Sequence, residues 1–335
     1  MGRRARPHRA GRPGRAGGRR PDRPVRRRRR AARGHRGLTV PRAAVATPRD
    51  LTGRTVVVTG AGRGSIGLAT ARILADWGAE VVVTTRSAPV PAPLGDAVAW
   101  HPLDLADRDS VDAFAAWLLD RYDGRLDTLV NNAGIHLDLR STWTEPPLVD
   151  GHEIHWRTNY LGTVQLTRLL LPALLARADD GGEARVVHVV SKLHRRGSNV
   201  ALHDGVEPYD SWAAYGTSKL ALVHDAAELY RRHGDRGLRA CSVHPGSVFT
   251  HIADHGLETS PVLGRLRALA APLERRILLT PEQGAQTTLH CVADPDVRHG
   301  YFRDCAPAEP SVDALDVVAA QQLWERTDAW LTETR

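Results

Sequence analysis

The stretch Thr59-Gly-Ala-Gly-Arg-Gly-Ser-Ile-Gly67 decides the fold of this chain. It follows the short β-branched run Arg54-Thr-Val-Val-Val-Thr59, and apolar residues at helical spacing begin at Ile66 and continue to Trp77. Glycines let the backbone turn tightly and approach a pyrophosphate, and the first amides of the following helix point at that charge. A glycine-rich turn alone is weak evidence. Between a strand and a helix of one βαβ unit, it predicts a dinucleotide-binding Rossmann fold.

Outward from this turn, apolar strands alternate with amphipathic helices. We expect further strands near 80–85, 97–100, 128–131, 185–190, 239–243 and 300–303. Helices are expected near 110–122, 152–175 and 213–232, from about 280, and at the end of the chain to about 331. This alternation predicts an α/β fold with a doubly wound parallel sheet, covered by helices on both faces. We expect one domain over 51–335, with ligands at the carboxyl ends of its strands.

The N-terminal region, residues 1–50, has a different composition from the rest. It holds 18 arginines against two aspartates, whereas the remainder holds 28 basic and 36 acidic residues, so the net charge of +8 describes neither part. An Arg-, Gly- and Pro-rich segment cannot bury enough apolar surface to fold, which predicts a disordered basic tail on a mildly acidic body. Binding of nucleic acid through the arginines is an alternative that we do not expect. A further alternative is that the tail is not part of the native product.

Cysteine content and hydropathy exclude several protein classes. The cysteines are three in number and widely spaced: Cys241, Cys291 and Cys305. This pattern indicates neither a disulfide framework nor a zinc cluster and is typical of a cytoplasmic protein. The longest apolar run, 166–175, is interrupted and too short to span a bilayer. His152-Glu153-Ile-His155 has the wrong histidine spacing for a zinc protease, so no metal site is expected.

The end of the second strand, Val83-Thr-Thr-Arg-Ser87, bears on the choice of cofactor. A site that prefers NAD usually has Asp or Glu there to accept a hydrogen bond from the ribose 2′-hydroxyl. This chain has Arg86 instead, and a second guanidinium, Arg63, within the glycine-rich turn. Either could be an ordinary surface arginine, but together they suit a 2′-phosphate and predict NADP(H).

Several motifs along the chain resemble those of the short-chain dehydrogenase/reductase family, over about 52–335. The matching elements are the Thr59-Gly60 turn, Asp104-Leu105, Asn131-Asn-Ala-Gly134, Asn159, Ser191, Tyr215-Gly-Thr-Ser-Lys219 and His244-Pro-Gly246. Within the family the chain is most similar to retinol dehydrogenases and the WW-domain oxidoreductase group, because of the long stretch between Ser191 and Tyr215 and the ending Gly300-Tyr-Phe-Arg-Asp-Cys305.

The resemblance also implies a set of cofactor-binding residues. They are Gly60, Arg63, Gly64, Ser65, Ile66 and Gly67 in the turn, Arg86, Asp104 and Leu105, Asn131, Ala133 and Gly134, Tyr215 and Lys219, and Pro245, Gly246, Val248 and Thr250. One departure from the family pattern is that Ser65 looks inserted, which leaves open which amides meet the phosphate.

The chemistry of Tyr215 and Lys219 can be argued from the residues themselves. A phenol has an ordinary pKa near 10, too high for an efficient base at neutral pH. Lys219 is four residues on and shares a helix face with Tyr215, so we expect its ammonium group, helped by the positive charge of an oxidised nicotinamide, to lower the tyrosine pKa. Tyr215 would then exchange a proton with the substrate oxygen, Ser191 would hydrogen-bond that oxygen, and Asn159 would hold a water that resupplies Lys219.

The sequence therefore predicts an NADP(H)-dependent enzyme that interconverts a carbonyl and an alcohol on a mainly apolar small molecule. The expected substrate walls are 193–212 and 249–279, including Leu202, Trp212, Leu257, Val262 and Leu263, with His194 and His251 at the border. One alternative is a non-catalytic regulator that senses NADP(H); another is an epimerase or dehydratase that reuses the tyrosine. The oligomeric state stays open, a homo-oligomer included.

Overall fold

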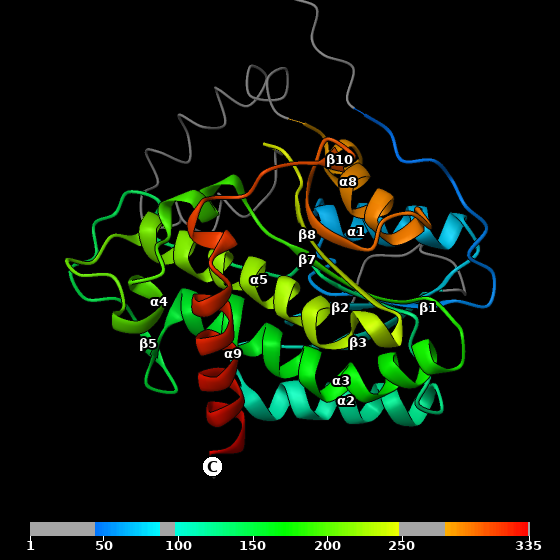
Figure 1. Ribbon diagram of the computed structural model, residues 1–335, viewed down its shortest axis with the longest axis horizontal. Coiled ribbons are helices and arrows are strands. Elements are labelled where there is room, and N and C mark those ends of the chain that lie inside the picture. The colour runs from blue at the N-terminus through cyan, green and yellow to red at the C-terminus, as the bar shows by residue number, and fades with distance from the viewer. Residues whose placement is uncertain (1–43, 88–97, 248–278, 334–335) are drawn as a thin grey trace, which may run out of the picture. The chain divides into compact units, whose positions relative to one another are not determined.

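The strands of the protein form one large sheet in the computed structural model, which describes residues 44–87, 98–247 and 279–333 (Figure 1). The strands of this sheet are β1 (Thr55–Val58), β2 (Glu80–Thr85), β3 (Val98–Pro102), β4 (Thr128–Asn131), β7 (Ala184–Val189), β8 (Leu238–His244), β9 (His299–Arg303) and β10 (Ala306–Pro307). Their order is β10-β9-β8-β7-β4-β1-β2-β3. All neighbours pair in parallel except β10, which is antiparallel to β9. The predicted doubly wound parallel sheet is thus confirmed.

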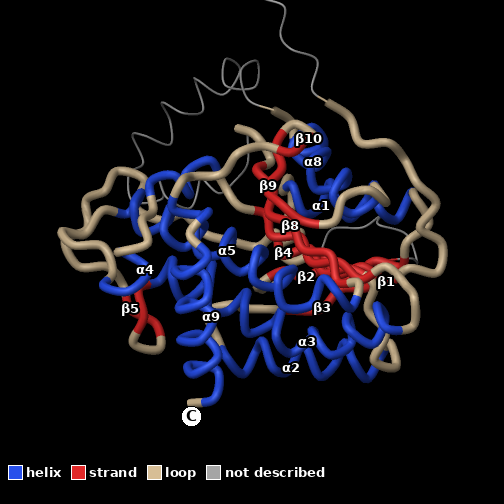
Figure 2. The backbone as a smooth tube through the Cα atoms, viewed as in Figure 1, coloured by secondary structure: helices blue, strands red, loops and turns tan. Residues whose placement is uncertain are grey.

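Helices cover both faces of this sheet, as Figure 2 shows. They are α1 (Ile66–Asp76), α2 (Arg108–Arg121), α3 (Gly162–Asp179), α4 (Ala201–Asp204), α5 (Ser211–His233), α8 (Pro281–Ala293) and α9 (Val317–Thr332). Single turns of 3₁₀-helix lie at η2 (Lys192–Arg196), η3 (Gly234–Arg236) and η4 (Asp313–Leu315). α1 and α8 pack together on one face, and α2, α3 and α5 lie on the other.

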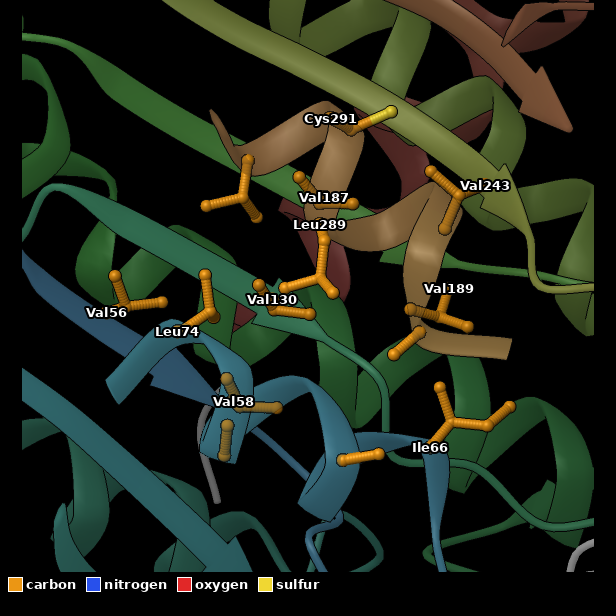
Figure 3. Packing of buried hydrophobic residues seen from close by; sticks show 14 of the residues in the cluster. Val56, Val58, Ile66, Leu74, Val130, Val187, Val189, Val243, Leu289 and Cys291 are labelled. Atoms are coloured by element: carbon orange, nitrogen blue, oxygen red, sulfur yellow. The ribbon is translucent and has the colours of Figure 1, made fainter. Parts of the chain in front are cut away.

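Each face of the sheet has its own apolar core. Between the sheet and α1 and α8, β-branched side chains of the central strands meet Leu74 and Leu289, as Figure 3 shows. On the opposite face, Phe114 and Leu170 are fully buried against Leu129. The central strands β1, β2, β4, β7 and β8 are buried along most of their length, which explains why the sequence shows them as continuous apolar runs rather than as alternating ones.

Residues 44–50, which the sequence assigned to the tail, pack against the folded body. Ala46 is 3% exposed, and its backbone amide donates to Gln286. Arg49 pairs with Glu183 and donates to the carbonyl of Ala293. The body therefore begins before the predicted boundary at residue 50, while the rest of the predicted tail, 1–43, lies outside the described residues.

The predicted helix at 152–175 is partly wrong. A two-stranded hairpin, β5 (Leu148–Val149) and β6 (His152–Glu153), comes first, followed by a π-helix, η1 (Trp156–Leu161), and only then by α3. Asp150 and Gly151 both have positive φ, +57° and +74°, as the tight turn of a hairpin requires. The Asp-Gly pair was the sequence signal for this turn.

Candidate active site

The glycine-rich turn is fixed against the end of β4. The hydroxyl of Thr59 accepts hydrogen bonds from the amides of Asn132 and Ala133, both at 3.0 Å. A Cβ on Gly60, where φ is +71°, would lie 2.7 Å from the Cα of Ala133. A Cβ on Gly67 would lie 2.5 Å from the side-chain amide of Asn132. Gly60 is therefore required by the close approach of two backbone segments, and Gly67 by the Asn132 side chain and by the carbonyl of Gly60, 2.7 Å from its Cβ position.

Ser65, the apparent insertion in the turn, is the N-cap of α1. Its hydroxyl accepts a hydrogen bond from the amide of Leu68 at 3.0 Å. The first amides of an α-helix have no partner within the helix. Since Ser65 takes the amide of Leu68, the amides of Ile66 and Gly67 are those left for an anion at this helix end.

The segments that carry Arg63 and Arg86 are joined because the glycine-rich turn runs beside the end of β2. The amide of Ala61 donates to the carbonyl of Thr84 at 2.8 Å, two residues before Arg86. Both arginines are exposed, and neither forms an ion pair with another described residue. Gly64, within the glycine-rich turn, has a φ of +69°.

The predicted adenine contacts, Asp104 and Leu105, follow β3 directly. Asp104 accepts a hydrogen bond from the amide of Ala106 at 2.9 Å, which shapes its own turn. Leu105 is 5% exposed, and its carbonyl accepts from the buried guanidinium of Arg157.

The side chain of Asn131 forms hydrogen bonds that connect elements of the fold. Its amide nitrogen lies 3.0 Å from the hydroxyl of Thr167 and 3.1 Å from Nδ1 of His188, and the residue is 2% exposed. It thus ties β4 to α3 and β7. Gly134, by contrast, lies against the lysine and asparagine of the predicted catalytic group: a Cβ there would be 3.0 Å from Nζ of Lys219 and 3.2 Å from Oδ1 of Asn159.

The four predicted catalytic residues come from three elements that meet at the carboxyl end of β7. Tyr215 and Lys219 are on α5, and the ammonium nitrogen lies 5.9 Å from the centre of the phenol ring. Lys219 donates to the carbonyl of Val189 at 3.1 Å. Ser191 follows β7 and caps η2 by accepting from the amide of Leu193.

Asn159 is fully buried in the π-helix and holds the chain that follows Gly134. Its Oδ1 accepts from the amide of Ile135 at 2.7 Å, and its Nδ2 donates to the carbonyl of the same residue at 2.9 Å. It also donates to the hydroxyl of Ser218 on α5. One side chain therefore links η1, the 135–137 segment and the catalytic helix; π-turns are often found at such sites.

Electrostatics at this site differ from the prediction for Tyr215. Burial raises the tyrosine pKa to about 12, against a smaller lowering by a hydrogen bond with Ser191. Burial also lowers the pKa of Lys219 to about 8. The expected lowering of the tyrosine pKa by the ammonium group is thus wrong for the protein by itself, because desolvation disfavours the charged form of both groups.

Sequence reasoning missed His136, which stacks on Tyr215 of α5. Its ring lies 4.2 Å from that of Tyr215 at an interplanar angle of 14°. Burial lowers the His136 pKa to about 4, so the imidazole is neutral at pH 7. The signal was its place two residues after Gly134, at the edge where ligands of such sheets bind.

His194, which the sequence placed at the border of the substrate pocket, connects η2 to the segment before η4. It is fully buried, its Nδ1 lies 2.7 Å from the carbonyl of Ser191, and its Nε2 accepts from the amide of Ser311. Trp212 donates to the carbonyl of Leu139, and its ring stands edge-on to that of His136.

The other end of the predicted cofactor site follows β8, where Pro245 and Gly246 lie. Gly246 has φ of +87°, and a Cβ there would be 2.5 Å from the side chain of Leu279. The remaining residues predicted for this region are outside the described part of the chain: Val248, Thr250, His251, Leu257, Val262 and Leu263.

The described residues contain no group of three or more His, Cys, Asp or Glu side chains arranged to hold a metal ion. Within the same ranges, none of the helices combines the length and hydropathy needed to cross a membrane.

Comparison with known proteins agrees with this geometry. A sequence profile of the short chain dehydrogenase family matches residues 54–260. Retinol dehydrogenase 12 of Mus musculus is 36% identical, with 82% of this chain and 85% of that protein covered. A probable oxidoreductase of Streptomyces lividans is 37% identical, with 82% and 97% covered.

Among solved structures, a metagenomic short-chain oxidoreductase in complex with NADP is 27% identical, with a TM-score of 0.51 and 78% of this chain and 100% of that chain covered. The chain thus combines a profile match over most of the folded body, relatives aligned over most of their length and the same fold. It belongs to the short-chain dehydrogenase/reductase family, as a retinol dehydrogenase-like member.

Proposed function

We propose that the protein is an NADP(H)-dependent oxidoreductase that interconverts a carbonyl and an alcohol on a mainly apolar small molecule, with Tyr215 as general acid and base. The observation that carries the proposal is the convergence of Tyr215, Lys219, Ser191 and Asn159 at one strand end, with Gly134 packed against the amine, where a Cβ would lie 3.0 Å from Nζ.

The residues present fit a dinucleotide. The amides of Ile66 and Gly67 suit its diphosphate, and the exposed guanidiniums of Arg63 and Arg86 suit a 2′-phosphate. When bound, the nicotinamide supplies or accepts the hydride. Lys219 uses one N–H on Val189, so its other donors are available for ribose hydroxyls.

Proton transfer falls to Tyr215. Because its pKa is about 12, the phenol is protonated at neutral pH and can donate to the oxygen of a carbonyl substrate. Ser191 would hydrogen-bond the same oxygen and stabilise its developing charge. Asn159 forms hydrogen bonds with both backbone groups of Ile135 and so fixes the segment after Gly134, which faces Lys219.

An apolar substrate is supported by the names of relatives. Proteins similar to this chain are called retinol dehydrogenase and polyprenol dehydrogenase, and both names denote apolar alcohols. Four expectations stay predictions. They are a single domain over 51–335, the cytoplasmic location, the absence of a nucleic-acid partner, and the roles of Val248 and Thr250.

Replacing Tyr215 with phenylalanine tests the proposal. The variant removes one hydroxyl, so the rate of NADPH oxidation with aldehydes and ketones should fall by about 10²- to 10⁴-fold. Binding of NADPH, followed by its fluorescence, should change little. The alternative of a non-catalytic sensor requires the opposite result: wild-type protein that binds NADPH tightly but turns over no carbonyl in a broad panel.

A further inference from the structure

A cavity open to solvent lies beside α5. It has a volume of about 580 Å³ and is lined by the β5–β6 hairpin, the π-helix η1, α4 with the segment up to Tyr209, and α9. It touches the catalytic helix only through Ala214 and Thr217, the neighbours of Tyr215. None of the residues proposed for cofactor binding or catalysis lines it.

The walls of this cavity are mainly apolar and aromatic. Trp156, Tyr209 and Trp330 contribute rings, and Leu148 and Leu202 contribute aliphatic side chains. A volume of this size suits a drug-sized molecule. Aromatic faces attract cations through their quadrupoles, more strongly where water is excluded.

The charge in the wall comes from Glu153. Its Oε1 accepts from the hydroxyl of Tyr209 at 3.0 Å, and its Oε2 accepts from the amide of Trp156 at 2.8 Å. Its third partner is Nδ1 of His155 at 2.7 Å, and Nε2 of that ring accepts from the amide of Leu137. No lysine or arginine among the described residues pairs with this carboxylate.

The other charged groups around the cavity do not supply the missing cation. Glu145, Asp204 and Glu207 add negative charge. Arg326 is a cation in the wall, but its guanidinium donates to the carbonyl of Leu202 and to Nδ1 of His203 and forms no ion pair with Glu153. Burial lowers the pKa of His152, which favours its neutral form.

An unsatisfied polar group in the wall points to a ligand as well. Thr217 is 3% exposed, and its hydroxyl has no hydrogen-bond partner in the described part of the chain. Buried hydroxyls are nearly always paired in native proteins, and a ligand group or a water would complete this one.

We propose that this cavity binds an organic cation, an amine or quaternary ammonium on an apolar body, with its charge at Glu153 and its body against Trp156 and Tyr209. The cavity borders Leu202, in the segment 193–212 that the sequence predicted as a substrate wall, but none of the proposed catalytic or cofactor-binding residues lines it, and the proposed binding does not depend on the proposed reaction.

The test is calorimetric titration of the full chain with benzyltrimethylammonium and with its uncharged isostere neopentylbenzene. The two probes have the same shape, so their difference reports the charge alone. The wild-type protein should bind the cation about tenfold or more tightly than the isostere. Glu153→Gln should abolish that preference, whereas Glu325→Gln, which removes a charge from an exposed position of α9 outside the cavity, should keep it.

A second variant tests the cavity independently, in case Glu153→Gln does not fold. Ala201→Trp leaves the carboxylate intact and fills the cavity, so it should weaken both probes while the thermal transition stays close to that of the wild type. Equal binding of both probes, a preference that survives Glu153→Gln, or no effect of Ala201→Trp would each overturn the proposal. Because the readout is binding, its failure would leave the proposed oxidoreductase activity untouched.

Discussion

Tyr215 and Lys219 are buried together on one helix, and burial moves their pKa values in opposite directions, to about 12 and to about 8. Each shift favours the uncharged form of its group. The phenol is therefore set to donate a proton, which suits carbonyl reduction, and removal of its proton during alcohol oxidation needs a positive charge nearby. The amine still carries its proton at pH 7, since its pKa lies above that value.

Arg86 is the single residue on which the proposed preference for NADP(H) depends most. Arg86→Asp replaces a donor for the 2′-phosphate with an acceptor for a ribose hydroxyl, so the ratio of kcat/KM with NADPH to that with NADH should fall by about 10- to 100-fold.

Steady-state kinetics with both cofactors measures this ratio. Arg72→Asp, at an exposed position of α1, makes the same charge change away from the end of β2 and should leave the ratio nearly constant. An unchanged ratio in Arg86→Asp would show that this arginine is an ordinary surface residue.

At the scale of elements, the junction of the π-helix η1 with α3 is held by close packing. Gly162, the first residue of α3, lies so near the end of β3 that a Cβ would be 1.9 Å from the carbonyl oxygen of Leu105. Backbone atoms cannot move aside as a flexible side chain can, so this glycine fixes where the π-turn ends and hence where Asn159 points.

Gly162→Ala should lower the free energy of unfolding by about 1–3 kcal/mol, because overpacking forces the backbone of α3 or of the Leu105 turn to shift. Chemical denaturation measures the change. Gly62→Ala is the matched control: no atom lies within 4 Å of the added Cβ, so its stability should stay within about 0.5 kcal/mol of the wild type.

The sequence predicted the regular elements of this fold well and the irregular ones poorly. β1, β2, β4 and β7 were predictable because a run of apolar β-branched residues buried on both faces has few other structures to form. The hairpin at Asp150-Gly151 and the π-turn after it were hidden within an apolar pattern that also fits one long helix. His136 was missed, and the pKa of Tyr215 was misjudged, because both depend on which distant segments bury the phenol.

For the molecule as a whole, buried histidines should make folding sensitive to acid. Burial lowers the pKa values of His136, His224 and His244 to about 4. An unfolded chain, with histidine pKa values near 6.5, binds more protons than the native one between these limits. Stability is therefore present above about pH 6.5 and is lost as the pH falls toward 4.

Thermal melts across this pH range test the expectation, which is a falling Tm below about pH 6.5. His224→Gln keeps an amide next to Asn199. It should reduce by about one the number of protons that the unfolded chain binds in excess of the native one, and so weaken the dependence of Tm on pH. His299→Gln, at an exposed position, should leave the dependence as it is in the wild type. A Tm that is flat between pH 7 and pH 4 would contradict the assignment of these histidines as neutral.

The chain has only two lysines, and their surroundings differ sharply. Lys192 is exposed beside Ser191, whereas Lys219 is 3% exposed. An acylating reagent applied to the intact protein would therefore mark Lys192 and the terminal amine. Lys219, more nucleophilic than an ordinary lysine because its amine is deprotonated more easily, would be marked only when the crevice opens to the reagent, so its labelling would record that opening.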